Sequence, residues 1–476
     1  MESQCPEKNR RVAGVLMPLS ALPGAYGGGT LGAQAVRFAA RLAAGGFSLW
    51  QMLPVNPVGA GNSPYSSPSA FAGNLFLIDP EELQQAGLLS ADDLPDWRCE
   101  SPHAVDYDFL RATRVLLLRR VFDAAPASAL AAVAAFHQRA RDWLDDYAHY
   151  QTQTEGETPD FWIFAQWIFD TQWRTFQTKV HALGVQLVGD IPFYVAAQSA
   201  DFVAHPELFV TDGAHLTQVA GVPPDYFTPR GQLWGNPLYD WAAHRADGYR
   251  WWRARVARVL DLFDRVRLDH FRALSRYYAV PADAPDATEG VWQGGPGMEL
   301  LSALPHTEHL IAEDLGQIDD DVRDLLRESG LPGMRVLQFA FDGDGHNIHL
   351  PHNYPKNCVA YTGTHDNNTL LGYIWEADAA ERARALAYLD IAHEDWGCGG
   401  TAAPIVRAAC RTLGQSAAET VIVPLQDLLG YGADTRTNTP GVAGGNWTFR
   451  VTEAQLETLD TAALYAHNDR YGRAGE

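Results

Sequence analysis

Short apolar runs that end in Gly, Pro, Asn or Asp alternate with longer segments of helical periodicity along most of this chain. Residues 33–44 show the helical pattern, because Val36, Ala39, Ala40 and Ala43 recur on one face. Near-continuous apolar strands separated by helices predict a parallel sheet that is covered on both faces. Eight such strands fit an α/β fold of the closed (β/α)8 TIM-barrel type. The predicted strands are residues 12–16, 47–53, 185–189, 266–269, 309–313, 336–341, 358–361 and 420–424.

The spacing of these strands is uneven, and it predicts one catalytic barrel domain, residues 1–476, with two insertions. The first insertion, about 58–180 after the second strand, is partly helical, with helices expected at 106–150 and 161–183. The second, about 195–258 after the third strand, is loop-rich because of its many prolines and glycines. Barrel active sites lie at the C-terminal ends of the strands, so we expect the second insertion to form a lid over a cleft. The tail after about residue 456 is expected to be expendable.

Composition narrows the functional classes. The chain has 476 residues, of which 46% are hydrophobic and 20% charged, as in ordinary globular proteins. A net charge of −22 argues against nucleic acid or an anionic membrane as a partner. The five cysteines are odd in number and widely spaced, so neither a disulfide framework nor a thiolate metal site is expected. No apolar run of the signal-peptide or membrane-span type is present, which predicts a cytoplasmic protein.

The end of the fourth predicted strand carries the first candidate for chemistry. Arg267 and Asp269 are two residues apart, so their side chains share one face of the strand. A neighbouring guanidinium lowers the pKa of a carboxyl group and keeps it ionised, which suits a nucleophile. His270 follows and adds hydrogen-bond donors. The alternative is a structural ion pair at a strand end.

Two further carboxyl groups stand at strand ends. Glu313 ends the fifth predicted strand beside the apolar Ile311, and Asp366 follows the seventh. An apolar environment raises a carboxyl pKa, as a general acid working near neutral pH requires. One ionised and one protonated carboxyl group, ~5–5.5 Å apart, suit retaining glycosyl transfer. The alternative, that all three groups are structural, is disfavoured because carboxylates at this end of a barrel usually serve chemistry.

Several other motifs have simpler explanations. The glycine-rich run at 27–32 matches a dinucleotide-binding pattern, but no acidic residue follows at the required distance, so we expect a tight turn. His346, His349 and His352 match no standard metal-ligand spacing and are expected on an exposed loop. Residues 319–321, three aspartates, are expected to cap a helix, and the pair Trp251-Trp252 is expected to pack against the core.

Taken together, these residues resemble amylomaltase, the bacterial 4-α-glucanotransferase or disproportionating enzyme of the α-amylase clan. The resemblance covers about residues 14–450, nearly the whole chain. It is carried by specific motifs, which are GNSPY at 61–65, SAFAGN at 69–74, AHPELF at 204–209, VAGVPPDYF at 219–227, GQLWGNPLY at 231–239, RLDHFR at 267–272, AEDLG at 312–316 and THDN at 364–367.

The resemblance implies that Asp269 is the nucleophile, Glu313 the acid/base and Asp366 the stabiliser of the transition state. The implied substrate-binding residues contact sugar at the cleavage point (Arg267, His270, His365, Asp190), on the donor side (Ser63, Tyr65), on the acceptor side (Tyr226, Phe227, Trp234) and at a sugar hydroxyl (Asn438).

The implied reaction moves a segment of α-1,4-glucan from a donor maltooligosaccharide to another glucan or to glucose. The resemblance implies no metal ion and no organic cofactor. Two alternatives remain open at this stage: an α-1,4-glucan hydrolase with the same site, and a non-catalytic glucan-binding protein.

Overall fold

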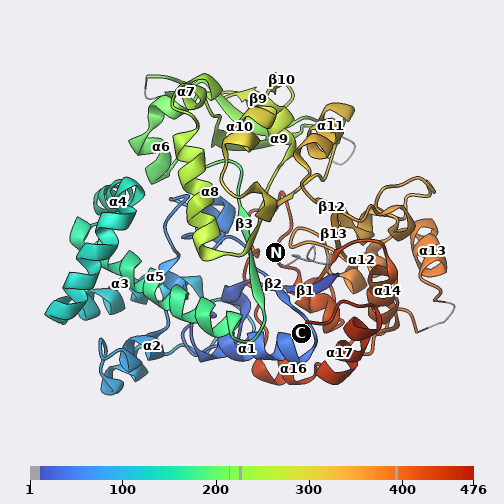
Figure 1. The fold of residues 1–476 in the computed structure, drawn as a ribbon, viewed down its shortest axis with the longest axis horizontal. Coiled ribbons are helices and arrows are strands. Elements are labelled where there is room, and N and C mark those ends of the chain that lie inside the picture. The colour runs from blue at the N-terminus through green and yellow to red at the C-terminus, as the bar shows by residue number, and fades with distance from the viewer. Residues whose placement is uncertain (1–10, 214, 225–227, 392–394, 476) are drawn as a thin grey trace, which may run out of the picture.

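A closed barrel of eight parallel strands lies at the centre of the described part of the chain (Figure 1). The computed structural model describes residues 11–213, 215–224, 228–391 and 395–475. The strands follow one another around the barrel in the order β1-β14-β13-β12-β11-β8-β3-β2, which confirms the predicted (β/α)8 architecture. Their bounds are β1 Val12–Leu16, β2 Leu49–Gln51, β3 Gln186–Ile191, β8 Arg265–Leu268, β11 Leu310–Ala312, β12 Gly333–Val336, β13 Cys358–Tyr361 and β14 Thr420–Pro424.

The prediction was wrong at the sixth strand. Residues 336–341 were expected to form it, but β12 ends at Val336 and a short 3-10 turn, Leu337–Phe339, follows. Val336 packs inside the barrel, whereas Leu337 and Phe341 are buried in the main core outside it. An apolar run without a period of two shows that a segment is buried but does not distinguish a strand from a buried turn.

Helices surround the barrel and fill the connections between strands (Figure 1). As predicted, an aspartate caps a helix at 319–321, because the Asp319 side chain accepts a hydrogen bond from Val322 N at 3.1 Å. The helices are α1 Ala33–Ala44, α2 Pro80–Gln85, α3 Tyr107–Asp123, α4 Ala127–Glu155, α5 Pro159–His181, α6 Ala200–Ala204, α7 Trp241–Ala246, α8 Arg250–Leu262, α9 Arg272–Ser275, α10 Gly297–Ala303, α11 Asp320–Ser329, α12 Leu370–Glu376, α13 Ala379–Tyr388, α14 Pro404–Gln415, α15 Leu425–Leu428, α16 Glu453–Glu457 and α17 Thr461–Arg470.

The long connection between β2 and β3 contains α2 to α5. Helices α4 and α5 pack against each other along their length, and α5 also contacts α1 and β3 of the barrel. In Figure 1 this helical group lies to the left of the barrel. Thus α5 belongs to the layer around the barrel, whereas α4 lies outside that layer.

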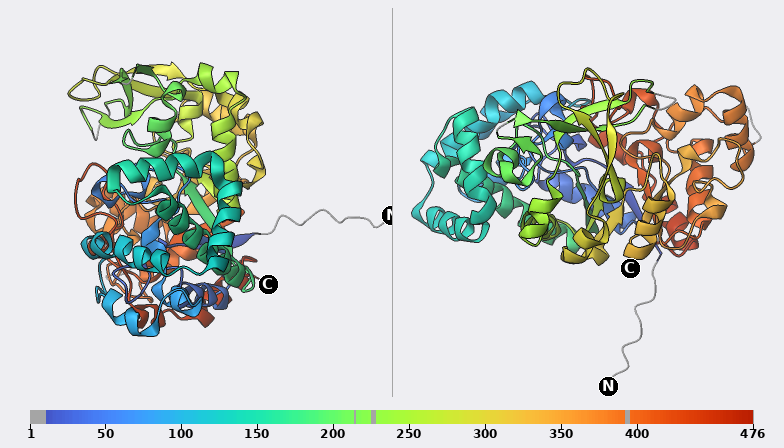
Figure 2. Two further views of the ribbon diagram at one scale, coloured as in Figure 1. Left: turned by 90° about the vertical axis from the view of Figure 1, so that its left-hand side faces the viewer. Right: turned by 90° about the horizontal axis from the view of Figure 1, so that it is seen from above.

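The second connection, expected to be loop-rich, contains strands as well as loops. β6 (Gln218–Val222) and β7 (Gln232–Pro237) join β9 (Arg276–Pro281) and β10 (Val291–Gly294) in an antiparallel sheet of order β10-β9-β6-β7. A two-stranded ribbon of β4 (Thr211–Asp212) and β5 (His215–Leu216) precedes it. Figure 2 shows this sheet standing above one side of the barrel. Its strands come from segments before and after β8, a pairing that proline and glycine content does not reveal.

The C-terminal tail was expected to be expendable, and the structure contradicts this. Helix α17 packs against α1 and α14. Arg473 is 1% exposed and donates to the carbonyl oxygens of Gly414, Ser416, Ala418, Glu419 and Val12. The tail therefore satisfies backbone acceptors beside β1 and β14. In the described part of the chain, no helix is both long and apolar enough to cross a membrane.

Candidate active site

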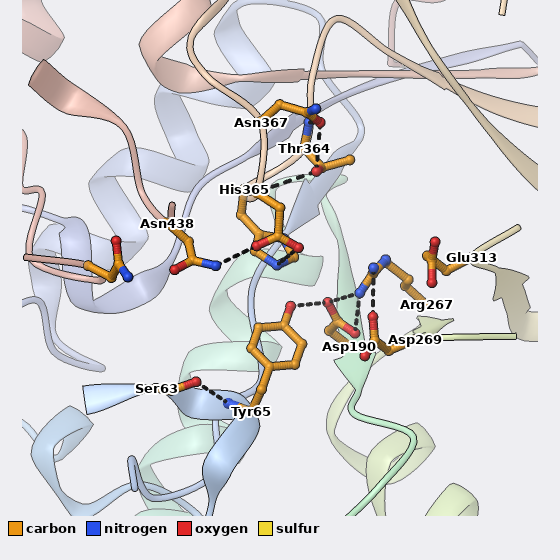
Figure 3. A network of polar contacts seen from close by, with 12 residues as sticks. Ser63, Tyr65, Asp190, Arg267, Asp269, Glu313, Thr364, His365, Asn367 and Asn438 are labelled. Atoms are coloured by element: carbon orange, nitrogen blue, oxygen red, sulfur yellow. Dashed lines mark hydrogen bonds and ion pairs between the residues drawn. The ribbon is translucent and has the colours of Figure 1, made fainter. Parts of the chain in front are cut away.

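A buried arginine joins two carboxyl groups at the C-terminal ends of β3 and β8 (Figure 3). Arg267 Nη1 donates to both oxygens of Asp190, at 3.0 and 2.8 Å, and Arg267 Nη2 lies 2.8 Å from Asp269 Oδ1. Burial alone would lower the pKa of Arg267, but the charges of Asp190 and Asp269 raise it well above its usual value. Arg267 is therefore a fixed cation beside Asp269, as the strand alternation predicts.

Asp190 is fully enclosed and is bonded within the protein. Besides the two bonds from Arg267, its Oδ2 accepts a hydrogen bond from the Tyr65 hydroxyl at 2.8 Å. Burial raises the pKa of Asp190 to about 6, with Arg267 opposing and Asp269 adding to the shift. Ser63 in turn accepts a hydrogen bond from Tyr65 N at 3.2 Å and caps the turn that carries Tyr65. In this structure Asp190 thus orients Arg267 and Tyr65; its predicted contact with sugar stays a prediction.

Glu313 follows β11, the neighbour of β8 in the barrel. Its Oε2 accepts from His270 N at 2.7 Å and its Oε1 from Leu315 N at 3.0 Å. Burial raises the pKa of Glu313 to about 8, with Arg267 opposing and the charge of Asp269 adding to the shift. His270 has a left-handed backbone (φ 50°), uncommon for a residue with a Cβ atom, and its N–H is directed at Glu313. Glu313 is therefore a protonated acid at neutral pH.

Asp366 lies in the loop after β13, next to His365, which Figure 3 labels. Asn438 Nδ2 donates to Asp366 Oδ1 at 2.6 Å, and His365 Nε2 lies 3.3 Å from Asp366 Oδ2. Burial would raise the pKa of Asp366, but His365 and Asn438 hold it below its usual value. Arg436 Nη2 donates to the carbonyl oxygen of Asp366 at 2.5 Å and fixes the loop from the other side. Asp366 is therefore ionised, in contrast to Glu313.

Aromatic rings line both sides of these carboxyl groups. Tyr65 stacks on His365 with ring centres 5.1 Å apart, and Trp447 lies 5.8 Å from Tyr65 and 6.0 Å from His365. On the other side, the ring of Trp234 in β7 lies edge-to-face with the ring of His270, and the two ring centres are 4.9 Å apart. The predicted residues Tyr226 and Phe227 lie outside the described residues.

The sequence reasoning missed some residues of this site. Trp447 and Arg436 come from the last segment before the C-terminus, and Tyr194 contacts both Trp234 and His270. Arg436 stands two residues before the predicted Asn438, which was a signal in the sequence, whereas Trp447 and Tyr194 are identified by their proximity in space. The predicted residues that are brought together at the barrel mouth are Ser63, Tyr65, Asp190, Arg267, Asp269, His270, Glu313, His365, Asp366 and Asn438, with Trp234 at the edge.

The motifs set aside from the sequence have structural partners. His349 Nδ1 accepts a hydrogen bond from Val336 N and His352 pairs with the Tyr388 hydroxyl. Among the described residues, no group of His, Cys, Asp and Glu is arranged to hold a metal ion. In the glycine-rich turn, a Cβ atom on Gly32 would lie 2.1 Å from Asp79 Oδ2. Trp251 and Trp252 are buried in the core, as expected.

Comparison with known proteins places this chain in a family. The family model described as 4-alpha-glucanotransferase matches residues 17–160 and 151–456. A 4-alpha-glucanotransferase of Thermus thermophilus is 39% identical, over 96% of this chain and 98% of the relative. The chain belongs to the 4-alpha-glucanotransferase family.

Other members of the 4-alpha-glucanotransferase family agree in sequence and in structure. The protein of that name from Aquifex aeolicus is 39% identical over 93% of this chain and 96% of the relative. The solved structure of amylomaltase from Streptococcus agalactiae in complex with acarbose superposes with a TM-score of 0.92 at 32% identity, covering 98% of this chain and all of that one. The closed barrel is therefore that of a 4-alpha-glucanotransferase family member.

Proposed function

We propose that this protein is a 4-α-glucanotransferase that moves a segment of α-1,4-glucan from a donor maltooligosaccharide to a second glucan or to glucose, by retaining double displacement. The observation that carries the mechanism is the contrast between two carboxyl groups on adjacent strands. Asp269 is paired with the Arg267 cation, whereas burial raises the pKa of Glu313 to about 8. Environments that differ in this way assign one group as nucleophile and the other as acid.

In the first half of the reaction, an oxygen of Asp269 attacks the anomeric carbon of the donor sugar. Glu313 gives its proton to the glycosidic oxygen, so the leaving chain departs as an alcohol and a glycosyl ester remains on Asp269. The anomeric centre carries positive charge in the transition state, and the ionised Asp366 supplies negative charge near it. The hydrogen bond from Asn438 keeps that carboxylate in one orientation.

In the second half, an acceptor hydroxyl attacks the same carbon and gives its proton to Glu313. The structure supplies a physical reason for this change of role. The charge of Asp269 is one cause of the raised Glu313 pKa, and ester formation removes that charge. The pKa of Glu313 then falls while the Arg267 cation remains, so the group that acted as an acid becomes a base.

The remaining predicted residues are assigned to the substrate by the resemblance to amylomaltase. Arg267, His270 and His365 are assigned to the cleavage point, Ser63 and Tyr65 to the donor side, and Trp234 to the acceptor side. Tyr226 and Phe227, which lie outside the described residues, are assigned to the acceptor side on the same ground. Asn438 is assigned to a sugar hydroxyl. Maltooligosaccharides, α-1,4-glucans and glucose are thus the proposed partners. The net charge of −22 and the free Cys99, Cys358, Cys398 and Cys410 support action in the cytoplasm, away from nucleic acid and membranes.

The test is a time course with maltotriose as the sole substrate, in which the products are separated by chain length. Transfer yields glucose together with a ladder of longer maltooligosaccharides. Glucose and maltose without longer products would identify an α-1,4-glucan hydrolase instead, and binding without turnover a non-catalytic glucan-binding protein.

The nucleophile has its own test with the same assay. We expect Asp269→Asn to lower the transfer rate at least a thousandfold, because an amide cannot form the ester intermediate. Asp324→Asn, an exposed change on α11, is the matched control and should transfer at the wild-type rate. Full activity in Asp269→Asn would contradict the assignment of Asp269 as the nucleophile.

A further inference from the structure

A second cavity lies behind the barrel wall, between α14 and α17. It has a volume of about 560 Å³, and its floor includes Ala13, Val421 and Val423 on the outer faces of β1 and β14. Figure 1 shows α14 and α17 side by side at the lower right. None of the proposed catalytic or sugar-binding residues lines this cavity, so it is separate from the site at the barrel mouth.

The lining of this cavity is basic, in contrast to the rest of the molecule. The chain has 58 Asp and Glu against 36 Lys and Arg, yet the lining holds four arginines, Arg407, Arg411, Arg470 and Arg473, against the single carboxylate of Asp460. The Asp460 carboxylate is already engaged within the protein, because it caps α17 by accepting a hydrogen bond from Ala463 N at 3.0 Å. The balance of charge therefore favours a negatively charged occupant.

Three of the arginines have no carboxylate partner among the described residues. Arg407 and Arg411 are exposed, and they are the only charged residues of α14. They stand four positions apart on one face, where like charges repel each other and destabilise a helix. Arg411 donates only to the carbonyl oxygen of Leu389, at 3.3 Å, and Arg470 forms no ion pair within the described chain. These guanidinium groups are available to an anion.

Below this basic rim the cavity is apolar. Val406, Leu428, Leu459 and Leu464 line it together with the strand residues of the floor. Burial, with Arg470 and Arg473 nearby, lowers the pKa of His467 and so disfavours its charged form. A volume of about 560 Å³ lies in the range of ligand sites, about 300–1,000 Å³. A neutral glucan would leave the arginines unpaired, and inorganic phosphate would leave the apolar floor empty.

We propose that this cavity binds a small organic anion with an apolar body, whose charged group lies between Arg407, Arg411 and Arg470 and whose body covers the apolar floor. Guanidinium groups bind carboxylate, sulfonate and phosphate oxygens through paired N–H donors. The proposal assigns the full-length protein a second ligand site, independent of its glucan substrates.

The test compares two fluorescent probes that share one aromatic skeleton. 8-Anilinonaphthalene-1-sulfonate carries the negative charge, and N-phenyl-1-naphthylamine lacks it. We expect the anionic probe to bind the wild-type protein, and the double variant Arg407→Gln/Arg411→Gln to weaken its binding at least tenfold. In the same double variant, the affinity for the neutral probe should differ from that of the wild type by less than twofold. The control variant Arg323→Gln/Arg327→Gln removes the same charge from exposed positions on α11 and should leave both probes unaffected.

A second variant locates the probe without changing charge. Ala463 is an exposed residue of the cavity lining, so Ala463→Trp fills the cavity from the surface and should displace both probes. Maltotriose turnover at the wild-type rate shows that each variant is folded. The proposal is overturned if the anionic probe fails to bind, if it binds Arg407→Gln/Arg411→Gln or Ala463→Trp as it binds the wild type, or if maltotriose displaces it.

Discussion

At the scale of single residues, the properties of the site depend on the coupling between Asp269 and Glu313. Arg267 contacts Asp269 directly and acts on Glu313 only through its field, where it opposes the rise of the Glu313 pKa. Ile311 and Leu315, two residues to either side of Glu313, belong to the apolar interior of the barrel. The two strand ends thus hold carboxyl groups in different surroundings, one in contact with a cation and one whose pKa burial raises.

The activity of the enzyme should therefore fall as the pH rises. The pKa of Glu313 is raised to about 8, so the acid keeps its proton below that pH and loses it above. We expect kcat/KM for maltotriose to decline above about pH 8 in the wild type. Glu313→Gln should lower kcat/KM by at least a hundredfold and abolish the alkaline decline of the residual activity. The control Glu328→Gln, exposed on α11, should keep the wild-type profile. An alkaline decline that persists in Glu313→Gln would assign the acid to another group.

The same carboxyl group should make stability depend on pH. An unfolded Glu titrates near ~4.3. Between that value and about 8, the folded protein holds a proton that the unfolded chain releases, so the free energy of unfolding falls as the pH rises through this window. The glutamine side chain does not titrate in this pH range, so the variant lacks this contribution to the pH dependence of stability. We expect the melting temperature of Glu313→Gln, minus that of the wild type, to increase from pH 5 to pH 8 in calorimetry. A constant or shrinking difference would contradict the raised pKa.

At the scale of secondary-structure elements, the C-terminal segment packs against the outside of the barrel. Arg473, which follows helix α17, donates to carbonyl oxygens beside β1 and β14, the first and last strands of the barrel, which pair with each other. In addition, Asn468 Nδ2 donates to the carbonyl oxygen of Gly45 at the end of α1, at 2.9 Å. The two ends of the barrel sequence are thus linked through one short helix.

Loss of this link should destabilise the whole fold. Arg473 donates five hydrogen bonds to backbone carbonyl oxygens, and truncation would remove all five. Gly414 and Ser416 would keep bonds from Arg11, and Glu419 one from Val12 N. Hydrogen bonds to a charged group contribute about 1.5–3 kcal/mol each. We expect Arg473→Ala to lower the free energy of unfolding by about 3 kcal/mol or more in urea titrations. Arg470→Ala, three residues earlier and exposed, should change it by less than about 0.5 kcal/mol.

At the scale of the whole molecule, the site is a barrel mouth bordered by segments that are remote in sequence. The antiparallel sheet of β6, β7, β9 and β10 contributes Trp234, whose ring lies against His270 beside Glu313. From the opposite side, the C-terminal segment contributes Asn438 and Trp447. We expect both borders to restrict the access of water to the proposed glycosyl ester on Asp269, which would favour a sugar acceptor over hydrolysis.

The balance between transfer and hydrolysis should therefore depend on Trp234. The indole is 39% exposed, so its removal should not disturb the core. We expect Trp234→Ala to raise the ratio of hydrolysis to transfer about fivefold or more, measured as new reducing ends against longer products from maltotriose. Leu233→Ala changes the adjacent exposed residue and serves as the control. An unchanged ratio in Trp234→Ala would show that this ring does not keep water from the intermediate.

The sequence by itself determined the features that depend on local patterns. Strand β13 and helix α1 begin and end at the predicted residues, because the apolar period and the flanking glycine, proline and polar residues act locally. Asp269 and Glu313 could be chosen from their own strands, since a neighbouring arginine or an apolar neighbour is visible in the sequence. Their roles remain proposals until the variants above are measured.

Only the tertiary structure decided what depends on contacts between distant segments. The end of β12, the sheet of β6, β7, β9 and β10, and the burial of Arg473 each result from pairing or packing with residues far along the chain. The same holds for the hydrogen bonds from Tyr65 to Asp190 and from Asn438 to Asp366, which join residues 125 and 72 positions apart. A pattern along one segment encodes which of its faces is buried, but not which distant segment covers that face.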